Sequence, residues 1–105
     1  MQRRRSDMSE AINVIAVITA HAGEEKTVAQ ALQTAVSEVQ GELGCESYVL
    51  HQNINNPLQF IMLERWQSQQ HLDAHEKAAP FQKLAGILAD RASLEITLAR
   101  EVTAA

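Results

Sequence analysis

The hydrophobic pattern over residues 11–66 predicts a strand, a helix and two further strands. Residues 11–21 (AINVIAVITAH) are rich in Val and Ile and apolar on both alternating faces, which is typical of a strand covered on both sides. Over residues 24–41 apolar side chains recur every three or four positions, which predicts a helix. Residues 45–53 and 58–66 alternate, and a short polar turn joins them, so they are expected to form an antiparallel hairpin.

The second half of the chain predicts a helix and a last strand. Ser68 is a good N-cap for a helix that begins at Gln69, and Pro80 interrupts the helical pattern before a second helical run. Residues 93–100 alternate between apolar and polar side chains, as strands do. The element order β-α-β-β-α-β indicates an α+β protein of the ferredoxin-like class, with an antiparallel sheet and helices on one face.

The same pattern predicts one domain that pairs with a second copy of itself. Residues 1–10 are polar and aperiodic, so we expect a disordered tail followed by a single domain over residues 11–105. The first and third strands are apolar on both faces, but the chain has no spare element to cover the face away from the helices. A homodimer with two sheets packed face to face would cover it.

Composition narrows the classes of partner and of chemistry. A length of 105 residues leaves no room for a separate cofactor domain. Nine basic against thirteen acidic residues give a net charge of −4, which argues against nucleic acid and anionic membrane partners. Cys45 is the one cysteine, so neither a disulfide framework nor a thiolate zinc site is expected, and a reducing, cytoplasmic location fits.

His75 and Glu64 are the candidate acid–base residues. His75 follows Leu72 on the inward side of its predicted helix, and a histidine can accept a proton near neutral pH. Glu64 lies on an apolar strand face, where a carboxyl group must be hydrogen-bonded or protonated. His71 and His75 are four residues apart, but no motif supplies a third ligand, so we expect no metal site.

The chain has only four aromatic residues, and these are candidate substrate-binding residues because they could line a pocket for a flat ligand: Tyr48, Phe60, Trp66 and Phe81. Asn13 is a fifth candidate, since a polar side chain in an apolar strand must find partners. For Trp66 and Tyr48, core packing is the alternative interpretation.

These residues, in this order and spacing, resemble the antibiotic biosynthesis monooxygenase family over residues 12 to 101. The similarity rests on a Gly-Cys-x-x-Tyr run, a turn ending in Pro, Phe-x-x-x-Glu-x-Trp, and a helix histidine: Gly44, Cys45, Tyr48, Pro57, Phe60, Glu64, Trp66 and His75. The resemblance implies a dimeric α+β barrel with a pocket between sheet and helices in each subunit. By position, Trp66, Tyr48, Glu64 and His75 look like the family's pocket residues, and Asn13 is a weaker match.

The family resemblance also implies a reaction. Members include cofactor-independent monooxygenases that oxidise quinols and polycyclic anthrones with O2. In such a mechanism His75 or Glu64 removes a proton, and the electron-rich anion reacts with O2 without metal or flavin. Many relatives carry a second His where this chain has Pro80, and no His follows His75 as it does in haem-degrading members. A small-metabolite isomerase or lyase and a non-catalytic dimeric binding protein therefore remain as alternatives.

Overall fold

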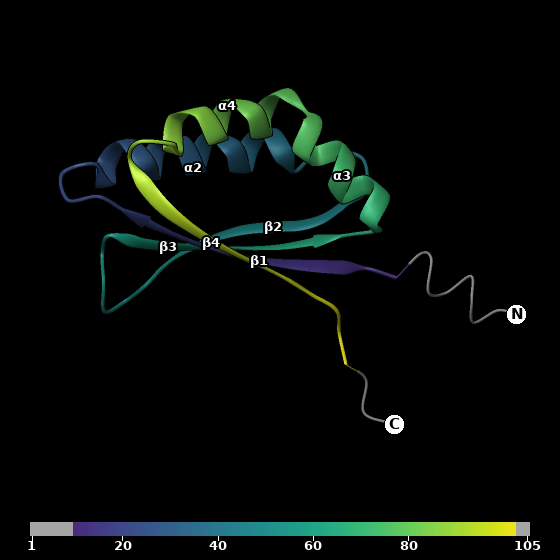
Figure 1. Ribbon diagram of the computed structural model, residues 1–105. Helices are drawn as coiled ribbons and strands as arrows, with labels where there is room; N and C mark the ends of the chain where they lie inside the picture. Colours follow the sequence, from purple (N-terminus) through teal and green to yellow (C-terminus); the bar gives the residue numbers. More distant parts are fainter. Residues whose placement is uncertain (1–9, 103–105) are drawn as a thin grey trace, which may run out of the picture.

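The computed structural model describes residues 10–102, which form a four-stranded antiparallel sheet with three helices on one face (Figure 1). The elements in chain order are β1 (Ile12–Ala20), α2 (Glu25–Val39), β2 (Cys45–Gln52), β3 (Gln59–Trp66), α3 (Gln69–Lys77), α4 (Ala79–Leu88) and β4 (Ala92–Ala99). The strand order is β2-β3-β1-β4, and every neighbouring pair is antiparallel. The expected α+β, ferredoxin-like fold is confirmed. Of the predicted tail, residues 1–9 lie outside the described part of the chain.

The core lies between the sheet and the helix layer. Alternate residues of β1 are buried from Ile12 to Ala20, and the side chains between them are only half-buried. From the helix side, α2 buries Val28, Leu32, Ala35 and Val39, which recur at helical spacing. The strand face that is buried at every second residue therefore packs against the helix face that is buried at every third or fourth residue, and together they form one aliphatic core.

The opposite face of the sheet has an apolar centre that is partly open in the single chain. Val49 on β2 and Leu63 on β3 are adjacent in the strand register and are 46% and 40% exposed. The neighbouring Ile15, Val17 and Ile61 are half-buried. No element within residues 10–102 covers this face, and the expected face-to-face homodimer stays a prediction.

The edge strand β4 is exposed even on the helix side. Leu94, Ile96 and Leu98 pair in register with the buried Ile18, Ala16 and Val14 of β1, so they share that face of the sheet. Each of the three is nevertheless about half exposed, because the helices cover the inner strands and stop short of β4.

The helical region is divided as its sequence predicts. The Ser68 side chain accepts a hydrogen bond from the His71 backbone N–H at 3.3 Å and caps α3. Ala78 then has an extended conformation, with ψ of 156°, and Pro80 falls in the first turn of α4, where its missing N–H costs nothing.

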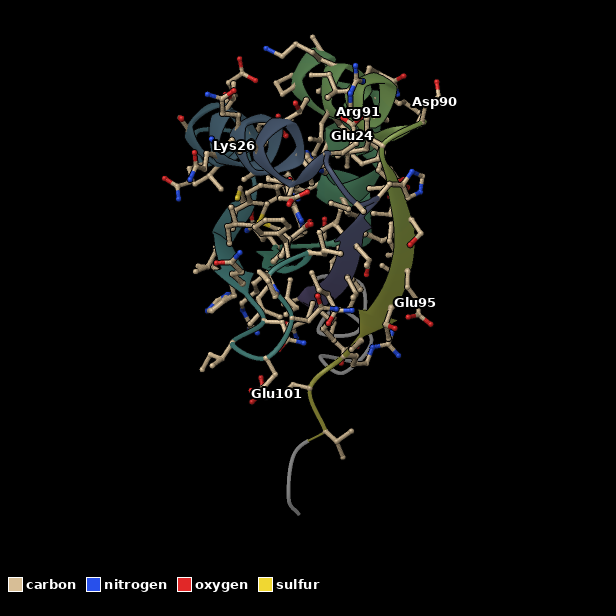
Figure 2. All side chains as sticks on the ribbon, turned by 90° about the vertical axis from the view of Figure 1, so that its left-hand side faces the viewer. Glu24, Lys26, Asp90, Arg91, Glu95 and Glu101 are labelled. Atoms are coloured by element: carbon tan, nitrogen blue, oxygen red, sulfur yellow. The ribbon has the colours of Figure 1, made fainter. Side chains whose placement is uncertain are left out.

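An ion pair joins the segment before α2 to the segment before β4 at one end of the fold. Arg91 Nε, before β4, lies 3.3 Å from Glu24 Oε1, before α2, and Figure 2 shows the two side chains beside each other. Glu95 points away from the helices on β4. No helix within residues 10–102 is long and apolar enough to cross a membrane.

Candidate functional site

Three aromatic rings surround His75 where the end of β3 meets α3. The His75 imidazole is stacked on Trp66, with ring centroids 4.5 Å apart and planes 26° apart. Tyr48 and Phe81 approach the same imidazole edge-on, with centroid distances of 5.8 and 5.2 Å. His75 is buried, so the structure brings together three of the four aromatic residues with the predicted helix histidine.

Local structure explains why these side chains converge. On β3, alternation places Glu64 and Trp66 on the face that meets the helices. The chain then turns, and Ser68 starts α3 only two residues after the strand. Leu72 and His75 are three residues apart on α3, so both face inward onto the end of the sheet.

Glu64 is a carboxyl group in an apolar setting. Its side chain belongs to a residue only 9% exposed, and its Oε1 accepts a hydrogen bond from Trp66 Nε1 at 2.9 Å. Burial raises the pKa of Glu64 to about 7, with smaller contributions from the nearby carboxylates of Glu76 and Glu42, while the bond from Trp66 opposes the rise. A carboxyl group with this pKa can exchange protons at neutral pH.

Glu64 lines a small apolar cavity between the sheet and α4. The cavity has a volume of about 60 Å³ and is lined by Tyr48, Glu64 and Phe81 together with aliphatic side chains of β1, β3, α2, α4 and β4. Two of these, Leu94 and Ile96, are half-exposed on β4, so the cavity lies close to solvent on that side. His75 and Trp66 are not among the lining residues, but both rings contact Tyr48, which lines the cavity, and Trp66 is hydrogen-bonded to Glu64.

The polar groups beside Glu64 are held in their neutral forms. Burial raises the pKa of the Tyr48 hydroxyl far above its usual range, and the carboxylates of Glu64 and Glu42 add to this rise. Burial also raises the pKa of the Cys45 thiol. Tyr48 therefore reaches the cavity as a hydroxyl that can donate a hydrogen bond, whereas Cys45 is no activated thiolate.

Glu42 is a residue of this site that the sequence analysis did not identify. It lies in the loop between α2 and β2, and its Oε1 accepts a hydrogen bond from His75 Nδ1 at 2.8 Å. Its Oε2 is buried and has no hydrogen-bond partner among the described residues. The sequence signal was a lone acidic residue between two glycines, which is equally typical of an exposed turn.

Other predicted residues lie elsewhere. Asn13 pairs with Arg65 in the β1–β3 register, on the sheet face opposite Glu64, so the structure does not bring it to this site. Phe60 is buried at the far end of β3, in the aliphatic core, and does not line the cavity. His71 Nδ1 pairs with Ser68 Oγ at 2.8 Å and not with His75. Within residues 10–102 no three His, Cys, Asp or Glu side chains are grouped to hold a metal ion.

Known structures share this fold. A Pseudomonas aeruginosa protein of 26% identity superposes with a TM-score of 0.86, over 91% of this chain and 98% of that chain. A conserved Bacteroides thetaiotaomicron protein, described as a possible oxidoreductase, is 22% identical with a TM-score of 0.85, over 89% and 99%. A solved antibiotic biosynthesis monooxygenase is 21% identical with a TM-score of 0.83, over 88% and 99%.

Sequence comparison supplies the family. A search of curated proteins found no match. The family model described as antibiotic biosynthesis monooxygenase matches residues 11–86. This range includes β1 through most of α4, and with them the four stacked or edge-on rings of the site: Tyr48, Trp66, His75 and Phe81. The chain therefore belongs to the antibiotic biosynthesis monooxygenase family.

Proposed function

We propose that the protein is a cofactor-independent monooxygenase that oxidises a quinol or a polycyclic phenol or anthrone with O2, and that Glu64 is its general base. The observation that carries the proposal is a carboxyl group with a pKa of about 7 in the wall of an apolar cavity. Membership of the family supports the class of reaction. The position of Glu64 favours it over His75, because only Glu64 of the two lines the cavity.

The reaction balances without a resident redox group. For an anthrone, Glu64 takes one proton from the activated CH2 carbon, and the carbanion passes one electron to O2. The substrate radical and superoxide join through a new C–O bond, and the protonated carboxyl group returns its proton to the peroxide. Loss of the remaining C–H proton breaks the O–O bond and releases water. One oxygen atom becomes the new carbonyl and the other becomes water.

The protein would contribute a base, orientation and a dry environment. Tyr48 can donate its hydroxyl hydrogen to the developing oxyanion, since it lines the same cavity as Glu64. Phe81 and the aliphatic side chains exclude water from the radical pair. The Trp66 N–H donates a hydrogen bond to the base Glu64, and the His75 ring stacks on Trp66.

The cavity also constrains how a substrate lies. A volume of about 60 Å³ is smaller than the roughly 300 Å³ at the low end of ordinary ligand pockets. We infer that the reacting edge of the ring enters the cavity, while the rest of the molecule lies over the half-exposed Leu94 and Ile96 of β4. A flat, largely apolar substrate matches both the apolar cavity and the exposed apolar side chains of β4.

The active assembly in this proposal is a homodimer. The sheet face that carries Val49 and Leu63 has an apolar, exposed centre, and a second copy of the same sheet packed face to face would cover it. This part of the proposal does not alter the site within each protomer.

The test is an oxygen-uptake assay with 1,8-dihydroxyanthrone as the probe. We expect one O2 consumed per anthraquinone formed, above the rate of spontaneous oxidation, and a loss of at least a hundredfold in Glu64→Gln. Glu38→Gln is the matched control, because Glu38 pairs with Lys83 on the outer surface of the helices. Product formation without O2 would overturn the proposal in favour of an isomerase or lyase. Binding of the probe without its consumption would favour a binding protein.

A further inference from the structure

Two carboxyl groups are connected through the stacked rings of the site. Glu42 Oε1 accepts from His75 Nδ1 at 2.8 Å, and the His75 ring lies on Trp66 with a centroid distance of 4.5 Å. Trp66 Nε1 in turn donates to Glu64 Oε1 at 2.9 Å. The chain of contacts therefore runs from the α2–β2 loop, through α3, to the carboxyl group on β3.

Hydrogen bonds hold the backbone on both sides of Glu42. Its N–H donates to Val39 O at 2.9 Å, and its carbonyl accepts from Cys45 N at 3.1 Å. Gly44, with φ of 81°, ends the loop, and its carbonyl accepts from Gln67 N at 2.8 Å. The held backbone fixes the direction in which the Glu42 side chain leaves the chain, and this direction is toward His75.

The side-chain environment of Glu42 makes His75 its essential partner. Glu42 has a side chain 19% exposed, while that of His75 is 2% exposed. The second oxygen, Oε2, is buried without a hydrogen-bond partner among residues 10–102. A largely buried carboxyl group with one partner holds that partner strongly, because losing the bond would leave both groups unsatisfied.

We propose that Glu42 is a positioning residue: it fixes the His75 ring against Trp66, and thereby fixes the Trp66 N–H on the Glu64 carboxyl group at the cavity. The proposal rests on the proposed function for its catalytic consequence, but its structural content can be tested without turnover.

Glu42 also acts on Glu64 through its charge. The charged and titratable groups around Glu64 are Glu42 from the loop, Cys45 and Tyr48 from β2, and His75 and Glu76 from α3. From α4 the cavity receives only apolar side chains. Removing the Glu42 charge should therefore lower the pKa of Glu64, while removing its hydrogen bond should loosen the rings, and two substitutions separate these effects.

The structural test follows the indole N–H signal in ¹H–¹⁵N NMR spectra, which is unambiguous because the chain has one tryptophan. In the unaltered protein the signal should titrate with a midpoint near pH 7, because its acceptor is Glu64. Glu42→Gln keeps an acceptor for His75 and should lower the midpoint with a sharp signal. Glu42→Ala should lower the midpoint and also broaden the signal, and Glu38→Gln should change neither.

The imidazole tautomer gives an independent readout in the unaltered protein. Long-range ¹H–¹⁵N spectra should show a proton on His75 Nδ1, the atom that faces Glu42. A ring without a proton on Nδ1 would overturn the proposal even if Glu42→Ala failed to fold. So would an indole signal that is identical in Glu42→Ala and Glu38→Gln.

The catalytic test uses the same variants with 1,8-dihydroxyanthrone. Glu42→Ala should lower kcat about tenfold with little change in KM, because a small displacement of a reacting group is costly. Glu42→Gln should recover most of this loss and should shift the lower limb of the pH profile toward acid. An unchanged kcat in Glu42→Ala would overturn the catalytic consequence. If the unaltered protein shows no turnover, the proposed function fails, while the NMR measurements still decide the role of Glu42.

Discussion

Replacing Glu64 by Gln should change how the stability of the fold depends on pH. Gln has the shape of a protonated Glu, and its amide oxygen can still accept the Trp66 N–H, which the carboxyl group accepts at 2.9 Å. The variant therefore keeps the packing and the hydrogen bond while it removes the titration. Any difference between the two proteins that varies with pH then reports the ionisation of Glu64.

The magnitude follows from the shift in pKa from the ordinary value of 4.5 to about 7 in the folded chain. A raised folded-state pKa means that the fold favours the protonated form, so its stabilising contribution is complete below pH 4.5 and is lost as pH rises through 7. At 1.36 kcal/mol per pKa unit, the loss is about 3 kcal/mol. That is a large share of the roughly 5–15 kcal/mol that stabilises a small domain.

Urea unfolding followed by far-UV circular dichroism at pH 4.5, 6, 7 and 8 measures this effect, at one fixed protein concentration because association shifts the transition. The stability of Glu64→Gln relative to the unaltered protein should rise by about 3 kcal/mol between pH 4.5 and 8. Glu38→Gln controls for the loss of a carboxylate at the surface. A difference between Glu64→Gln and the unaltered protein that stays constant over this range would refute the reasoning.

Three further predictions concern the loop, the indole and the open sheet face. Gly44→Ala should destabilise the fold by about 2 kcal/mol, because φ is 81° there and the new Cβ would overlap the His71 ring; an unchanged melting temperature would contradict this. Trp66→Phe removes the hydrogen bond that favours the ionised form of Glu64, so the lower limb of the pH–rate profile should move up by about one unit. Leu63→Lys should convert the proposed dimer to a monomer in analytical ultracentrifugation, and a monomeric unaltered protein would remove the dimer from the proposal.

The fold was largely predictable from the sequence because its periodicities are clean. The alternation over residues 58–66 placed Glu64 and Trp66 on one strand face, and the structure buries both on the helix side. Pro80 broke the helical pattern, and the structure has two helices that meet at Ala78. Patterns of this kind lie within short stretches of consecutive residues, so they predict helices and strands without information on tertiary contacts.

The site was predictable only in part because it depends on contacts between distant segments. Glu42 and His75 are separated by 33 positions, and no pattern along the chain links them. Asn13 lies on the sheet face opposite Glu64, and the sequence could not show this because both faces of its strand are largely apolar, which hides the face that the helices cover. The proposal of Glu64 over His75 as the base likewise rests on the cavity, which Glu64 lines and His75 does not.

The two loops of the β2 strand differ in how they would accept a change of length. The loop after β2 is exposed, with Ile54 at 96%, and loops of this kind normally tolerate insertions. Both loops are held by backbone hydrogen bonds, but the loop before β2 carries Glu42, so one added residue there would move the Glu42 side chain away from His75 on α3. A peptide tag therefore belongs between β2 and β3, and variation in loop length among relatives should be concentrated there.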